Sequence, residues 1–415
     1  MRSHDIRDYA ATFGAEFFVL VAGLLSLRLA AREFGTDGFG VYVLGRRSLA
    51  LLQLPATCGM AIGLTRFLAL HAGDRARRSG YFRAGVMIAL STTALCFALL
   101  LASGRHGAAL LFGDASDVVL LRALGVAMVG LVVHSIAYGV ARGRLRMLVA
   151  NGLQVVSLGL LPLAALSVPG ISVSTLFVVL GLGWSVFGGV TLAAFHAAHR
   201  AGPALRDREA ARTLLRFGVA RIPGELALGA LALLPVNLAA HVGGASAAGY
   251  LGIMTSLVTM IVSAFAPLGQ LLLPQIATMA GREEYGAIRR HARRATLLCV
   301  SLAALVVLLL EVTMGVIVSG YFGHAFLPAV PYARVGIIAA IPYTAYVVLR
   351  NVLDALEIRA LNAKNLIAGV GVLLIAFAVR PSLIALPIAY LTACTAVGVL
   401  SILDARRLMA RVSAR

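Results

Sequence analysis

The chain has 415 residues, of which 60% are hydrophobic and 13% charged, and its mean hydropathy is +0.93. Soluble domains have about 45–50% apolar and about 25% charged residues, so one globule of this size could not bury so much apolar surface. The composition excludes a disordered chain, a disulfide scaffold and a soluble nucleic-acid-binding protein, and no nucleic-acid partner is expected. It predicts an all-α integral membrane protein whose outer face contacts lipid.

Apolar stretches of about 20 residues recur along the chain, as expected for helices that cross a bilayer. Twelve spans are predicted, at 11–31, 41–64, 83–103, 118–140, 147–167, 173–195, 217–239, 250–273, 294–318, 333–355, 364–380 and 384–403. They divide the chain into an N-terminal six-helix bundle (1–198), a cytoplasmic connecting loop (199–216) and a C-terminal six-helix bundle (217–415). The first span lacks a signal-peptide cleavage pattern and is expected to be retained.

The basic residues are distributed unequally between the two sides of the predicted membrane. With the N-terminus inside, 25 of the 36 Lys and Arg residues fall in cytoplasmic segments, and the outer loops hold three, Arg32, Arg105 and Arg380. This positive-inside pattern predicts a multi-pass protein of the bacterial cytoplasmic (inner) membrane with both termini in the cytoplasm. It also accounts for most of the net charge of +19, because the basic loops face anionic lipid headgroups.

The two halves show weak internal similarity at an offset of 209 residues. Glu16 falls on Glu225, Gly35 on Gly244, and Gly40 on Gly249. An even number of helices in each half gives both halves the same orientation, which predicts a parallel repeat related by a pseudo-two-fold axis.

Eight arginines lie in or at the edges of the predicted helices. An Arg at the centre of a spanning helix costs about 2.5–3.5 kcal/mol on insertion scales, so such residues usually face a polar interior. Arg28 and Arg350, with Arg46 as a further candidate, are expected to line a central cavity and to bind an anion, in particular a phosphate. The alternatives are snorkelling to the headgroups and, for Arg350, an ion pair with Asp354 four residues on.

Three acidic residues in apolar context are candidates for coupling transport to an ion gradient: Glu16, Glu225 and Asp354. The alternative for the paired glutamates is that they neutralise nearby arginines at the interface. Pro223 and Pro235 are candidates for a gate in helix 7, and ordinary packing through small residues is the other interpretation.

No nucleophile–base arrangement, Walker A sequence or dinucleotide fingerprint is present, so the chain is not expected to be an enzyme and no catalytic residue is assigned. No metal site or cofactor is expected, and coupling to a proton or Na⁺ gradient is left open.

The run LAAREFGTDGFGVYVL, which contains Gly35, Gly38, Phe39, Gly40 and Tyr42, resembles the first outer loop of the polysaccharide flippases. These Wzx-type polysaccharide biosynthesis proteins are the O-antigen and exopolysaccharide transporters of the multidrug/oligosaccharidyl-lipid/polysaccharide (MOP) exporter superfamily. The run GMAIGLTRFLAL is similar to the end of that family's second helix.

The resemblance implies two six-helix bundles that form a V around a central cationic cavity. It implies a flippase that translocates an undecaprenyl-diphosphate-linked oligosaccharide to the outer leaflet by alternating access, for O-antigen (lipopolysaccharide), capsule or exopolysaccharide synthesis. Arg28 matches the family's helix 1 arginine, and Arg46 and Arg350 match those of helices 2 and 10. The implied partners are the lipid-linked oligosaccharide, membrane lipids and a glycan polymerase machinery.

Three other readings remain open. A major-facilitator porter also has six plus six helices, but HAGDRARRSG lacks the second Gly of that family's loop signature. An ion-coupled multidrug antiporter of the MOP superfamily has the same topology. A membrane polysaccharide polymerase or ligase would need a larger outer loop than any predicted here.

Overall fold

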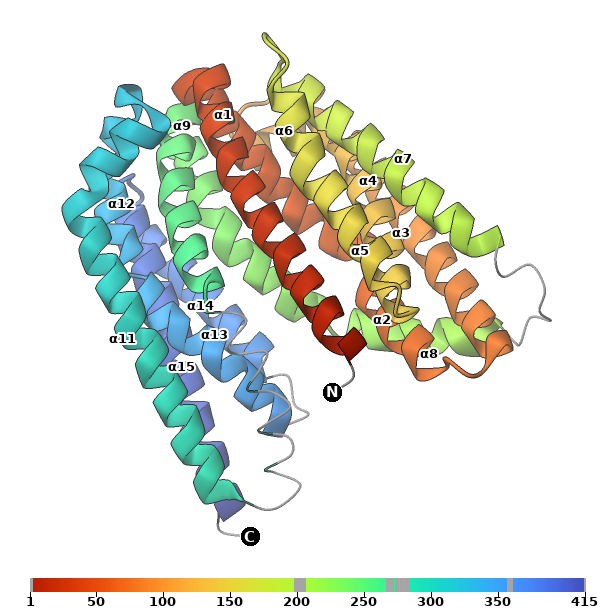
Figure 1. Ribbon diagram of the computed structural model, residues 1–415. Coiled ribbons are helices and arrows are strands. Elements are labelled where there is room, and N and C mark those ends of the chain that lie inside the picture. The colour runs from red at the N-terminus through yellow and green to blue at the C-terminus, as the bar shows by residue number, and fades with distance from the viewer. Residues whose placement is uncertain are drawn as a thin grey trace. The chain divides into compact units, whose positions relative to one another are not determined.

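The computed structural model describes residues 3–197, 207–265, 272, 276, 279, 284–356 and 361–413. Within these ranges the chain is helical and has no strand. Its contacts divide it into two compact units, Met1–Ile222 (unit 1) and Pro223–Arg415 (unit 2). The predicted all-α membrane fold is confirmed, and each unit is described by itself (Figure 1).

Unit 1 contains the helices of the first half of the chain. In chain order they are α1 (Ser3–Thr57), α2 (Met60–Leu70), α3 (Arg75–Phe112), α4 (Val118–Gly143), α5 (Met147–Gln154), a π-helix (Val155–Leu160), α6 (Leu161–Leu166), α7 (Val173–Ala197) and α8 (Asp207–Val219). Helices α4 and α7 approach closely because glycines face each other: a Cβ on Gly130 would overlap the Gly181 carbonyl oxygen. Small residues at such a crossing let two backbones pack tightly in a membrane.

Unit 2 contains the helices of the second half. They are α9 (Ile222–Ser263), α11 (Tyr285–Ile317), a π-helix (Val318–Phe322), a 3₁₀-helix (His324–Ala329), α12 (Val330–Ile337), α13 (Ala340–Leu356), α14 (Leu361–Val379) and α15 (Ala385–Ser413). A buried apolar cluster joins α11, α13 and α15, and its members include Ala292, Leu349 and Ala405.

Two long helices are interrupted by glycines at equivalent positions. Gly35 in α1 has φ 63° and ψ −167°, and Gly244 in α9 has φ 74° and ψ −168°. Nine described helices are long and apolar enough to cross a membrane, and the bent pair 324–337 and 340–354 raises this to ten. The predicted twelve helices are consistent with this count, because α1 and α9 are each interrupted at their glycine. The matching dihedral angles at Gly35 and Gly244 also support the internal repeat.

The surface of these helices is suited to lipid. Val312, Val316 and Val379 are 79%, 76% and 80% exposed, whereas a water-soluble protein of this size would cover most such side chains. Together with the apolar spans, this exposure defines a multi-pass membrane protein.

The segment 199–216, predicted as a connecting loop, is partly helical. Residues 198–206 lie outside the described residues, and from Asp207 the chain forms α8, which packs against α2 and α3 (Figure 1). Leu214 is buried on one face of α8, and Arg208, Arg212 and Arg216 are exposed on the others. This amphipathic pattern is typical of a helix that lies in the membrane interface.

Candidate functional site

A row of polar side chains runs along one face of α13. Tyr343, Tyr346, Arg350 and Asp354 follow one another at intervals of three or four residues, which places them on one face of the helix. The two phenol rings are stacked, with centroids 5.3 Å apart, and the Tyr346 side chain is almost fully buried. Arg350 is half-buried and lies within electrostatic range of both hydroxyl groups.

Asp354 is held by α14 and not by Arg350. The Asn362 side-chain amide donates to Asp354 Oδ1 over 2.7 Å and to the Arg350 carbonyl oxygen over 3.1 Å. Between Arg350 and Asp354 themselves no ion pair within 4.0 Å forms, although the spacing of four residues made one a natural expectation. The Asp354 carboxylate is therefore hydrogen-bonded to the Asn362 amide. The Arg350 cation has no acidic partner among the described residues.

The two other arginine candidates belong to α1 in unit 1. Arg28 precedes the break at Gly35 and Arg46 follows it, and both side chains are exposed on the unit. Arg46 forms no hydrogen bond or ion pair with any residue that the structure describes. The sequence analysis expected both arginines to line a central cavity and bind an anion, and this stays a prediction.

The acidic coupling candidates differ in their surroundings. Glu16 is exposed on α1, and Glu225 is half-buried in the first turn of α9. A fourth acid in an apolar helix, Glu311, lies 3.8 Å from Arg334, so that carboxylate is neutralised by a nearby cation.

The two gating candidates occupy different parts of α9. Pro223 is the second residue of the helix, a position where its missing N–H leaves no intrahelical bond unmade, so it does not bend the helix. Pro235 is inside the helix and buried. The non-helical dihedral angles of α9 are at Gly244, nine residues after Pro235, which is where the helix changes direction.

The sequence analysis missed a buried polar network between α14 and α15. The Asn365 side-chain amide lies 3.1 Å from Asp404 Oδ2 and 3.4 Å from Ser401 Oγ, and all three side chains are at most 9% exposed. The signal was present, since Asn365 and Asp404 are polar residues within or beside apolar runs. Asp404 was overlooked because it is followed by a basic segment that reads as a solvated helix end.

No family model matches the chain, and no curated protein matches it. Solved structures do. The chain superposes with a TM-score of 0.82 on an inward-facing multidrug resistance MATE family transporter of the MOP superfamily, at 13% identity, covering 95% of this chain and 96% of that one. An outward-facing MATE transporter of the same superfamily gives a TM-score of 0.63 at 13% identity, covering 97% and 96%. A MATE protein in a bent conformation gives 0.63 at 14%, covering 98% and 97%.

These matches extend over almost the whole of each chain. The fold is therefore that of the solved MATE family transporters.

Proposed function

We propose that the chain is a MOP-type transporter that carries an undecaprenyl-diphosphate-linked oligosaccharide across the inner membrane by alternating access. Two lines of support converge. The fold is one in which other proteins have been solved in inward-facing and outward-facing conformations. The outer-loop residues from Gly35 to Tyr42 resemble the polysaccharide flippases within the same superfamily.

The choice of substrate rests on which charged side chains in the helices have a partner and which do not. Arg46 and Arg350 have no acidic partner among the described residues, whereas Asp354 accepts a hydrogen bond from Asn362 and Glu311 lies beside a cation. Guanidinium groups without an acidic partner, together with carboxylates that already have a hydrogen bond or a cation beside them, favour an anion over a cationic drug. A diphosphate fits this chemistry because guanidinium groups bind phosphate oxygens through paired, charge-assisted hydrogen bonds.

The remaining residue roles follow from this substrate. Each of three arginines contacts the diphosphate at some stage of the cycle: Arg28, Arg46 and Arg350. Proton or Na⁺ coupling is assigned to Glu16, Glu225 and Asp354. Bending of α9 during the cycle is assigned to Pro235, whereas Pro223 marks the start of the helix.

The test is complementation in a bacterial strain that lacks its own flippase, with glycan at the cell surface as the readout and protein level as the control. Arg350→Ala and Arg28→Ala are each expected to reduce surface glycan about tenfold or more, since each removes charged hydrogen bonds to phosphate. Arg350→Lys keeps the charge but loses the paired geometry, so a smaller loss is expected. Arg380→Ala, at an exposed loop position, is the matched control and should have no effect.

A second candidate function is ion-coupled multidrug antiport. The observation that favours it is the high structural similarity to a multidrug resistance transporter. In that case the variants Glu16→Gln and Asp354→Asn should abolish resistance to cationic drugs in a susceptible strain, and Arg350→Ala should leave that resistance unchanged. Normal surface glycan in the arginine variants together with drug resistance in the wild type would replace the flippase proposal with this one.

A further inference from the structure

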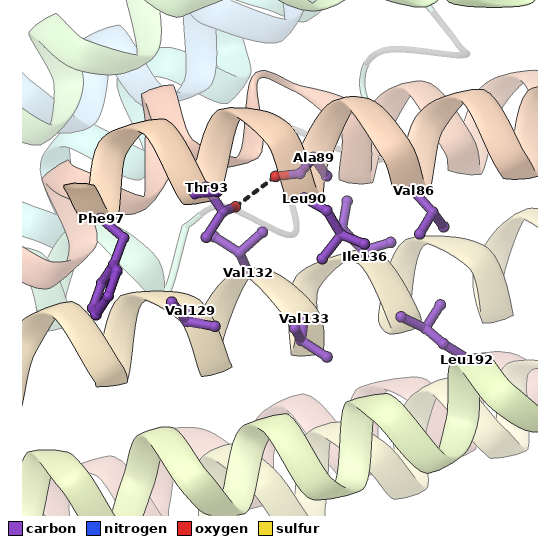
Figure 2. Close-up of a pocket in the computed structure, with 11 residues that line it drawn as sticks. Val86, Ala89, Leu90, Thr93, Phe97, Val129, Val132, Val133, Ile136 and Leu192 are labelled. Carbon is purple, nitrogen blue, oxygen red and sulfur yellow. Dashed lines mark hydrogen bonds between the residues drawn. The ribbon is translucent and has the colours of Figure 1, made fainter. Parts of the chain in front are cut away.

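An apolar groove lies on unit 1 between α3, α4 and α7. It has a volume of about 270 Å³, and Figure 2 shows Val86, Phe97, Val133 and Leu192 among its lining side chains. The polar atom of Thr93 in the groove is already satisfied, because its hydroxyl donates to the Ala89 carbonyl oxygen over 2.6 Å (Figure 2). The groove therefore offers only apolar contacts along its length.

Arg144, in the turn between α4 and α5, is not part of the groove lining but is near the end of the groove at Val86 and Leu192. Val86 is one helical turn from Phe82 on α3, and Leu192 is about one turn from Phe195 on α7. The Arg144 guanidinium carbon lies 5.5 Å from the centroid of the Phe82 ring and 4.6 Å from that of Phe195. A cation enclosed by two aromatic rings therefore lies about one helical turn beyond this end of the groove.

Arg144 has hydrogen-bond donors that the protein does not use. Its Nη1 donates to the Phe195 carbonyl oxygen over 3.4 Å, but Nε and Nη2 are buried and have no partner among the described residues. The Nε of Arg78 is also buried and unpartnered, while its Nη1 donates to the Ala72 carbonyl oxygen over 3.0 Å. Buried donors without an acceptor are costly, so such groups are usually completed by a bound molecule.

The charges around Arg144 are all of one sign. Burial, followed by the positive charges of Arg78 and Arg146, lowers the pKa of the Arg144 guanidinium to about 10, so it is still a cation at neutral pH. Asp74, the acid closest in sequence to Arg78, accepts a hydrogen bond from the backbone N–H of Arg77 and also pairs with the Arg77 side chain at 3.4 Å. In the part of the chain that the structure describes, no acid pairs with Arg144 or Arg78.

We propose that the unit 1 groove binds a membrane phospholipid with an anionic headgroup. The phosphate accepts hydrogen bonds from Arg144 and Arg78, and one acyl chain lies along Val86 and Leu192. A zwitterionic headgroup fits less well, because its ammonium would face the same cations with no free carboxylate beside them. The inference is independent of the transported substrate, since α3, α4 and α7 carry none of the arginines assigned to it.

Unit 2 has a corresponding cavity between α11, α13 and α15. It encloses about 620 Å³ and is lined by Arg289, Arg293 and Arg406 together with apolar side chains. Thr296, also in its lining, has a buried hydroxyl without a hydrogen-bond partner among the described residues. This cavity therefore places several cations beside apolar side chains, which makes it a second site for an anionic phospholipid.

The test is native mass spectrometry of the purified, delipidated full chain titrated with phosphatidylglycerol or with phosphatidylcholine of the same acyl chains. The wild type is expected to bind two phosphatidylglycerol molecules with similar affinity and phosphatidylcholine at least about tenfold more weakly. Arg144→Gln and Arg293→Gln should each lose one molecule, and the double variant should lose both. The matched controls Arg77→Gln and Arg290→Gln remove an exposed charge from the same helices and should still bind two.

Two further arms keep the interpretation specific to a lipid. Leu192→Trp fills the groove without changing the charge, and this variant should also bind one phosphatidylglycerol fewer than the wild type. It serves as the test of the unit 1 site if the Arg144→Gln variant does not fold. Inorganic phosphate should not displace the lipid, because it has no acyl chain. Binding of two molecules by the Arg144→Gln variant, equal affinity for phosphatidylcholine, or displacement by phosphate alone would each overturn the proposal.

Discussion

Replacing Gly35 by alanine should destabilise the protein through the backbone alone. Its φ of 63° and ψ of −167° fall in a region that is essentially restricted to glycine. A Cβ built there meets no atom within 4 Å, so no steric clash contributes. Backbone strain of this kind costs about 1–3 kcal/mol. The reduced entropy of the unfolded chain returns about 0.4–1 kcal/mol, so the expected net loss is about 0.5–2 kcal/mol.

The matched control is Gly23→Ala in the same helix. Gly23 also has open space around its Cβ position, but its backbone is helical, so alanine is expected to stabilise by about 0.5–1 kcal/mol. The assay is denaturant unfolding in one mild detergent, followed by circular dichroism. Gly244→Ala should behave like Gly35→Ala because its dihedral angles match, and the double variant should show the sum of the two losses. A Gly35→Ala protein as stable as the Gly23→Ala protein would refute the reasoning.

Two other predictions concern single side chains. The buried indole N–H of Trp184 donates to the Ser157 carbonyl oxygen of the π-helix over 2.7 Å. Trp184→Phe should therefore lower the free energy of unfolding by about 1–3 kcal/mol. An unchanged thermal midpoint, measured by circular dichroism, would contradict this. Removing the amide in Asn362→Ala should let Asp354 pair with Arg350 and so reduce surface glycan at an unchanged protein level. Normal surface glycan in this variant would contradict the interpretation.

The fold could be predicted from the sequence to a large extent because a bilayer imposes strong rules on composition and length. Twelve apolar stretches and the recurrence of Gly35 at Gly244 were sufficient to predict the crossings and to suggest the repeat. The helical segment after Asp207 was not predicted, because a basic amphipathic helix in the interface lacks a long apolar run and resembles a loop in a hydropathy profile.

The polar contacts were harder to predict. The spacing of Arg350 and Asp354 indicated a pair on one helical face, but the carboxylate is bound by Asn362, twelve residues after Arg350 on the next helix. Hydrogen bonds between side chains of different helices depend on how the helices pack and rotate against each other. The periodicity of a single helix gives no information on this. The same reason explains why Arg144, assigned only to a cytoplasmic loop by the sequence, turned out to be enclosed by Phe82 and Phe195.

The claim that the chain translocates a lipid-diphosphate glycan is tested most directly in reconstituted vesicles. Purified protein is inserted into liposomes that contain a fluorescent undecaprenyl-diphosphate oligosaccharide, and a membrane-impermeant enzyme that modifies the sugar reports how much reaches the other leaflet. The account predicts rapid exposure of the glycan with the wild type and slow exposure with Arg350→Ala. Equal rates for the wild type, the variant and protein-free vesicles would contradict it.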